Sequence, residues 1–209
     1  MPLSLGKQLL LALVLILATG AGIHNIAEAR NEAAVGGGAI RLEASRLNEM
    51  TDFGRILGVT ERLGRGELAE RLREVQRKGG LWAAPHLGAD HWALYVDTFG
   101  VVRRIYVRES ALHSPESQLF PRGDASIPPE KRRAFANVSL VGALFHELQH
   151  WEGVEDEALA YEREIAWLEA LQHSLPRQVG EGERDAIAWG VESALLSARK
   201  ARALAAGQP

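Results

Sequence analysis

Residues 141–168 read VGALFHELQHWEGVEDEALAYEREIAWL. Apolar side chains recur at helical spacing on both sides of Gly153, and glycine is common just beyond the end of a helix. Asp156 follows three residues later and is a good N-cap for a second helix. We therefore predict two helices joined by a tight turn, with the second helix returning alongside the first.

Further helix signals flank this turn towards the C-terminus. The first helix of the pair is expected to begin near Asn137 or Ser139, which are good N-caps, and the second to extend to about His173. A last helix is expected from about Glu183 to Ala205, because its apolar residues form one stripe.

Helical periodicity also covers residues 41–78. Two helices are predicted there, broken near Gly58 or Gly64. Gly79 is expected to end the second helix, because a glycine readily adopts the backbone conformation found just beyond a helix.

The period changes between residues 92 and 107. Residues 92–96 and 101–107 are rich in β-branched and aromatic side chains, and the segment between them has turn-forming residues, which indicates a β-hairpin. Residues 81–84 are a candidate third strand. The order of helices, hairpin and helices predicts an α+β fold, rich in helix, with a small antiparallel sheet preceding the helix around residue 146.

Residues 109–131 contain four prolines, which disfavour a helix interior. We expect a surface loop or a lid over this segment. The prolines are Pro115, Pro121, Pro128 and Pro129.

The N-terminus resembles an export signal. Lys7 precedes an apolar run over residues 9–18, and a small-x-small pattern occurs at residues 27–29. We predict a signal peptide over residues 1–29. An apolar stretch extended through Ile26 approaches the length of a membrane span, so an uncleaved membrane anchor is the alternative.

Both alternatives predict that the remainder of the chain lies outside the cytoplasm, as a periplasmic or extracellular protein or tethered to the membrane. The glycines at residues 36–38 indicate a short flexible joint. A single folded domain is expected over residues 39–206.

Composition excludes several kinds of site. The 24 basic and 27 acidic residues give a net charge of −3 without a long basic run, so nucleic acid is not an expected partner. The chain has 0 cysteines, which excludes disulfides and cysteine zinc sites. Any metal must therefore bind histidine, aspartate or glutamate.

Two histidines have the spacing needed to share one metal ion. His146 and His150 lie four residues apart, on one face of the predicted helix. Neutral imidazoles leave zinc a strong Lewis acid, and a neighbouring carboxylate can take a proton from an activated water. Glu147 is the residue placed to act as this general base.

A third metal ligand is expected from the second helix. Glu157 falls in the first turn of that helix, which the tight turn brings level with the histidines. It shares a stripe with Ile165 and Leu168, and a carboxylate on an apolar stripe needs a partner. Glu155 and Glu162 are the alternative ligands.

The string HELQH at residues 146–150, followed by EALAY at residues 157–161, resembles the zincin metallopeptidases, specifically small gluzincin-like ones. The resemblance implies a zincin-like domain that hydrolyses peptide bonds in a peptide or protein substrate. It also implies one Zn²⁺ ion held by His146, His150 and Glu157, with Glu147 as the catalytic base.

The resemblance leaves the supporting residues open. Tyr161 stands where large gluzincins often have an aspartate that orients a histidine, so it is a candidate for that outer position or for a transition-state donor. His113 and His173 are other candidate donors. In zincins a strand near the metal pairs with the substrate, and residues 101–108 are the candidate strand.

Two other functions fit the same sequence. In the first, the chain is a non-catalytic envelope or interaction protein whose zinc ion only stabilises the packing of two helices. In the second, it is a helical interaction module and the HELQH string is accidental.

Overall fold

The structure is a computed structural model that describes residues 45–46, 53–85, 87, 91–98, 100–113, 115–116, 126–175 and 179–207. The predicted export signal at residues 1–29 and the glycine joint at residues 36–38 lie outside the described residues. No helix among the described residues is long and apolar enough to cross a membrane.

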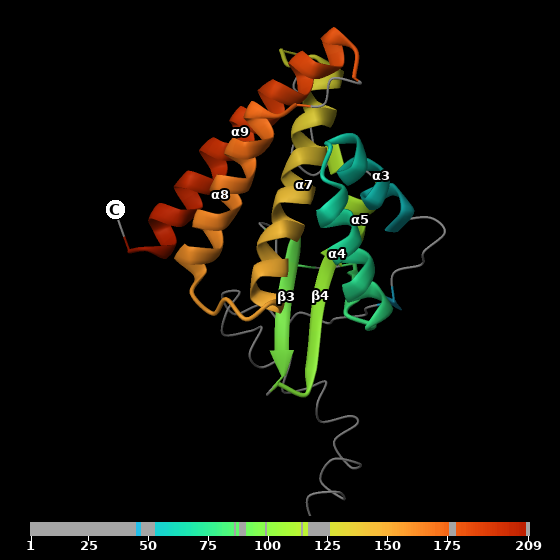
Figure 1. Ribbon diagram of the computed structural model, residues 1–209, viewed down its shortest axis with the longest axis vertical. Coiled ribbons are helices and arrows are strands. Elements are labelled where there is room, and N and C mark those ends of the chain that lie inside the picture. Colours follow the sequence, from blue (N-terminus) through green and yellow to red (C-terminus); the bar gives the residue numbers. More distant parts are fainter. Residues whose placement is uncertain are drawn as a thin grey trace, which may run out of the picture.

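The described elements form a helix-rich α+β structure with one small sheet (Figure 1). In chain order they are β1 (Ser45–Arg46), α3 (Gly54–Arg62), α4 (Gly66–Arg77), β2 (Leu81–Ala84), β3 (Ala93–Thr98), β4 (Val102–Arg108), α5 (Glu109–His113), α7 (Pro129–Trp151), α8 (Glu157–His173) and α9 (Glu181–Ala205).

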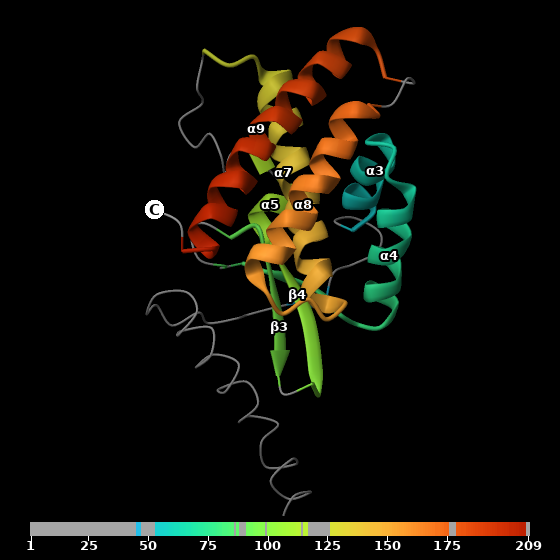
Figure 2. The same cartoon turned by 60° about the vertical axis from the view of Figure 1, so that its left-hand side comes forward.

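Helix α7 runs through the centre of the molecule (Figures 1 and 2). It packs against α8 and α9 on one side and against β3, β4 and α3 on another. Its side chains Leu144 and Leu148 are 0% and 1% exposed, and burying a leucine contributes about 1.5–3 kcal/mol. The helix that carries the HELQH string is therefore held from several directions.

The predicted hairpin is confirmed, but the sheet is mixed and not antiparallel throughout. Strands β3 and β4 pair antiparallel, whereas β2, the predicted third strand, pairs parallel with β4. The strand order is β1-β2-β4-β3, so β4 is internal and β3 lies at an edge.

The strand order contradicts the prediction that residues 101–108 pair with a substrate, because residues 102–108 form the internal strand β4. Strand β4 has no free edge, because Ile105 N donates to Gly80 O of the chain entering β2 at 2.7 Å and its other side pairs with β3. The edge available beside α7 belongs to β3.

The two N-terminal helices follow the prediction in part. The break falls at Gly64, whose φ is 71°, whereas Gly58 lies inside α3. Gly79 follows α4 with a φ of 74°, as predicted. The helical prediction over residues 41–78 is wrong at Ser45–Arg46, which pair with β2 as strand β1 and cover its edge.

Helix α7 begins earlier than predicted. Its first residue is Pro129, eight residues before Asn137, because a proline at the first helical position sacrifices no helical hydrogen bond. The predicted loop or lid over residues 109–131 also contains helix α5, which is too short for the helical periodicity to reveal.

The turn between α7 and α8 is as predicted. Helix α7 ends at Trp151, and Gly153 follows with a φ of 99°. Asp156 caps α8, since its Oδ1 accepts a hydrogen bond from Leu159 N at 2.7 Å. The last helix, α9, also occupies its predicted position within two residues.

Candidate metal centre

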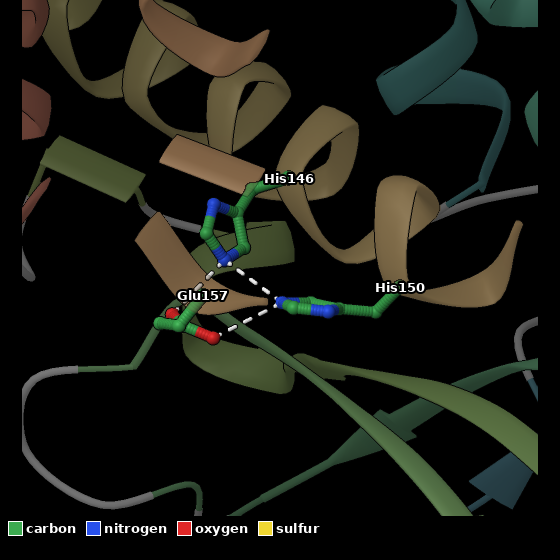
Figure 3. A group of neighbouring side chains, drawn as sticks. All are labelled: His146, His150 and Glu157. Carbon is green, nitrogen blue, oxygen red and sulfur yellow. Dashed lines mark hydrogen bonds and ion pairs between the residues drawn. The ribbon is translucent and has the colours of Figure 1, made fainter. Parts of the chain in front are cut away.

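The three predicted ligands converge at one end of the α7–α8 pair (Figure 3). His146 Nε2 and His150 Nε2 are 3.2 Å apart. Glu157 lies between them, with Oε1 3.1 Å from His146 Nε2 and Oε2 3.1 Å from His150 Nε2. All three side chains direct their donor atoms towards one another (Figure 3).

These separations suit a zinc ion. Tetrahedral ligands bound at about 2.0–2.1 Å from zinc lie about 3.3–3.4 Å from one another. The observed separations of 3.1 and 3.2 Å are close to this spacing. The donor set of two imidazoles and one carboxylate is also one that zinc prefers.

His150 is oriented by the turn that follows α7. Its Nδ1 lies 2.6 Å from Val154 O, and because a carbonyl can only accept, Nδ1 carries the proton. In the neutral ring this leaves the lone pair of Nε2 directed at His146 and Glu157. A hydrogen bond from the far nitrogen is the usual support for a histidine that binds a metal.

The far nitrogen of His146 faces the carboxylate of Glu164, a residue that the sequence did not predict for this site. His146 Nδ1 lies 3.3 Å from Glu164 Oε2, and the Glu164 side chain is only 12% exposed. Gly142 makes room for this carboxylate, since a Cβ there would lie 3.0 Å from Glu164 Oε1. The available signal was spacing, because Glu164 follows Glu157 by seven residues, about two helical turns.

The carboxylates change how the histidines titrate. Burial alone would lower the pKa of His146, but Glu157, Glu164 and Glu147 outweigh it and raise that pKa to about 10. Glu157 raises the pKa of His150, and the two histidines hold the pKa of Glu157 well below its usual range. The cluster is thus an ion-paired site that favours a cation.

Glu147 projects beside the cluster and is held by the sheet. Tyr95 N, on edge strand β3, donates a hydrogen bond to Glu147 Oε2 at 2.7 Å. Burial raises the pKa of Glu147 to about 7, against the opposing effects of His146 and the Tyr95 amide. A carboxyl with a pKa near neutrality is well matched to proton transfer.

A pocket of about 230 Å³ opens beside these residues. His146, Glu147, Tyr161 and Glu164 line it on one side, and α9 closes it on another. The Tyr161 ring lies 4.3 Å from the His146 ring, centre to centre. Burial and then the carboxylates Glu157, Glu164 and Glu147 raise the pKa of Tyr161, so the phenol keeps its proton.

The alternative ligands are not brought into this cluster. Glu155 is exposed in the turn before α8. Glu162 forms an ion pair with Arg202 of α9, on another face of α8.

The other candidate donors lie away from the cluster. His173 ends α8, about 24 Å along the helix from Glu157. His113 ends α5, whose Leu112 carbonyl accepts from Arg55. The same arginine binds Asn137, about 14 Å along α7 from His146.

Comparisons with known proteins found no relative of this chain. No family model matches the chain, and neither the curated proteins nor the solved structures gave a significant match. The function proposed below therefore rests on the residues of this chain and their geometry.

Proposed function

We propose that the protein is a zinc-dependent metallopeptidase that acts outside the cytoplasm. The observation that carries the proposal is the convergence of His146, His150 and Glu157, with Glu147 beside them. The Val154 carbonyl lies behind His150, and the Glu164 carboxylate lies within ion-pair distance of His146. One residue string supplies two ligands and a base, and the next helix supplies the third ligand. We propose in addition that the domain is zincin-like.

Each residue has a role in this chemistry. A zinc ion held by His146, His150 and Glu157 would polarise a peptide carbonyl and lower the pKa of a water molecule. Glu147 takes the proton from the attacking water and then passes it to the leaving amine. The hydrogen bond from Tyr95 N keeps the Glu147 carboxylate turned towards the cluster.

Tyr161 is the proposed transition-state donor. Its ring lies against His146 and lines the same pocket as Glu147, so a substrate in that pocket would meet its hydroxyl. The raised pKa keeps the hydroxyl protonated at neutral pH, as a hydrogen-bond donor to a developing oxyanion must be.

The number of ligands favours a catalytic zinc site over a purely structural one. Structural zinc sites are usually closed by four protein ligands, whereas catalytic sites have three and leave a position for water. Among the described residues the cluster contains three ligands, and the Glu157 side chain is 53% exposed. Such a site can admit a substrate.

Strand β3 is the proposed support for an extended substrate backbone. It lies at the sheet edge beside α7 and already contacts Glu147 through Tyr95. A peptide that pairs with this edge beyond the amide that Glu147 occupies would lie next to the proposed zinc ligands, and strand addition is a known way to hold a substrate backbone.

The test compares Glu147→Gln with the wild-type full chain. We expect the wild type to bind one zinc ion and to cleave fluorescein-labelled casein. Glu147→Gln should retain the zinc, because Glu147 is not a ligand, and lose about a hundredfold or more in kcat. Metal analysis and a fluorescence assay measure the two properties.

Glu155→Gln is the matched control, since it removes a nearby exposed carboxylate outside the cluster. It should leave both zinc content and hydrolysis unchanged. A wild-type protein that binds zinc without hydrolysing any peptide would favour the non-catalytic alternative, in which zinc has only a structural role. Full activity in Glu147→Gln would contradict the proposed mechanism.

A further inference from the structure

Tyr95 joins the hairpin to the proposed active site. Arg108 N donates to Trp92 O at 2.9 Å, and from this register the N–H of Tyr95 faces away from β4. That N–H donates to Glu147 Oε2 at 2.7 Å. The Tyr95 ring stacks on His150, with centres 6.2 Å apart and planes inclined by 16°.

The phenol of Tyr95 is in turn held by two residues of the hairpin. Arg103 Nε donates to Tyr95 Oη at 2.9 Å, and Tyr95 Oη donates to Asp97 Oδ2 at 3.2 Å. The hydroxyl therefore accepts one hydrogen bond and donates another. Both contacts restrict rotation of the ring.

Arg103 also contacts the end of helix α7. Its Nη2 donates to the carbonyl oxygen of Trp151, the last residue of α7, and its guanidinium lies 5.4 Å from the centre of the Trp151 ring. Carbonyls in the last turn of a helix have no partner within the helix, and a positive charge there is favourable. One side chain thus bridges the hairpin and the helix that carries the metal ligands.

We propose that Arg103 is a positioning residue: by binding Tyr95 and the Trp151 carbonyl together, it fixes the hairpin against α7 and so orients Glu147 and His150. The inference rests on the proposed function for the roles of Glu147 and His150. Because the Arg103 side chain is 40% exposed and charged contacts at the surface contribute little to stability, its loss should disturb the site more than the fold.

Hydrogen exchange of the Tyr95 amide tests this link in the full chain without metal. This amide faces the sheet edge, and Glu147 is its acceptor. In Arg103→Ala we expect its exchange, followed by NMR, to accelerate by about tenfold through local opening. The amides of Leu94 and Val96, which face β4, should keep their wild-type rates.

Arg104→Ala is the matched control. Arg104 is the next residue of β4, but its guanidinium lies 4.2 Å from the centre of the Trp82 ring, on the other face of the sheet. It should leave the Tyr95 amide unchanged. Arg103→Lys should give an intermediate rate, because an ammonium lacks the fork that binds two acceptors at once. This variant decides the question if Arg103→Ala does not fold.

Kinetics supply a second readout. Arg103→Ala should lower kcat on labelled casein by about tenfold, because the reacting carboxylate of Glu147 is displaced, and should also raise KM, because the proposed substrate edge β3 belongs to the same hairpin. A wild-type exchange rate at Tyr95 in Arg103→Ala, or equal acceleration in Arg104→Ala, would overturn the inference. Failure of the wild type to bind zinc would refute the proposed function. The exchange rate of the Tyr95 amide would still show whether Arg103 holds the hairpin against α7.

Discussion

Glu164 is a nearly buried carboxylate that faces the far nitrogen of His146. Such a partner raises the basicity of the imidazole and fixes its ring. Because the contact depends on where α8 crosses α7, helical spacing alone does not distinguish Glu164 from other acidic residues of α8. Gly142, on the facing helix, is what allows the carboxylate to approach.

Glu164→Gln should therefore weaken zinc binding by about 10- to 100-fold while leaving the protein folded. Competition with a chromophoric chelator measures the affinity. The control is Glu162→Gln, which removes the neighbouring carboxylate that pairs with Arg202. If the two variants bind zinc as tightly as the wild type, Glu164 has no supporting role.

Tyr161→Phe removes only the hydroxyl proposed to stabilise the transition state. We expect kcat to fall by about 10²- to 10³-fold with zinc affinity unchanged, as for other losses of an oxyanion donor. Tyr106→Phe is the control, because Tyr106 lies on the opposite face of the sheet and binds Arg104. Steady-state kinetics on labelled casein would contradict this role if both variants kept the wild-type kcat.

The raised pKa of His146 should make the proposed zinc binding depend on pH. In the metal-free protein this pKa is about 10, compared with 6.5 for an ordinary histidine, so the ring is protonated at neutral pH. Zinc binds only the neutral imidazole and must displace that proton. Zinc affinity should therefore increase from pH 6 to pH 9, with proton release that calorimetry in two buffers of different ionisation enthalpy detects. A pH-independent affinity would contradict this.

At the scale of elements, the structure confirms the features that short-range signals specify. The α7–α8 turn depends on Gly153 and the cap at Asp156, both local, and the hairpin depends on adjacent strands. The strand order depends on the parallel pairing of β2 with β4, two strands separated by a third, and no local pattern encodes it. The sequence therefore could not show that residues 102–108 form the internal strand β4 and that the edge strand is β3.

The same distinction applies to the candidate site. Helical spacing and the turn bring His146, His150 and Glu157 together, as the sequence predicted. The contact between Tyr95 and Glu147 joins residues 52 positions apart, and it could not be predicted without the position of β3. The predicted start of α7 is wrong because prolines disfavour only the interior of a helix, and Pro129 occupies the first helical position.

Close contact between α7 and α9 depends on Gly190. A Cβ at this position would lie 2.9 Å from Ala134 C and 2.9 Å from Phe135 N, both in the backbone of α7. Gly190→Ala should force the helices apart and lower the free energy of unfolding by about 1–3 kcal/mol. Urea denaturation measures this change.

Gly182→Ala is the control, because a Cβ at this position of the same helix would meet nothing within 4 Å. It should leave stability unchanged or raise it by about 0.5–1 kcal/mol through its better helix propensity. Equal effects of the two substitutions would show that the close approach at Gly190 does not limit the packing of α9.

At the scale of the whole molecule, zinc should stabilise the fold. A ligand that binds only the native state contributes about 2.7 kcal/mol at 100 times its Kd. For a domain of this size, that corresponds to an increase in Tm of roughly 5–10 °C. Thermal unfolding after EDTA treatment, with and without added zinc, measures the shift, and magnesium serves as the control metal. An equal Tm in all conditions would contradict zinc binding at this site.

The turn between α7 and α8 has a consequence for how the centre assembles. The outermost ligands, His146 and Glu157, are only 11 residues apart in the chain, so bringing them together closes a short loop at small entropic cost. Assembly of the proposed metal site is therefore an event of low contact order that needs only the helical hairpin of α7 and α8. The Glu147 carboxylate acquires its orientation only when the strand bearing Tyr95 docks, 52 residues away. We therefore expect the proposed metal ligands to come together before Glu147 is oriented for the proposed catalysis.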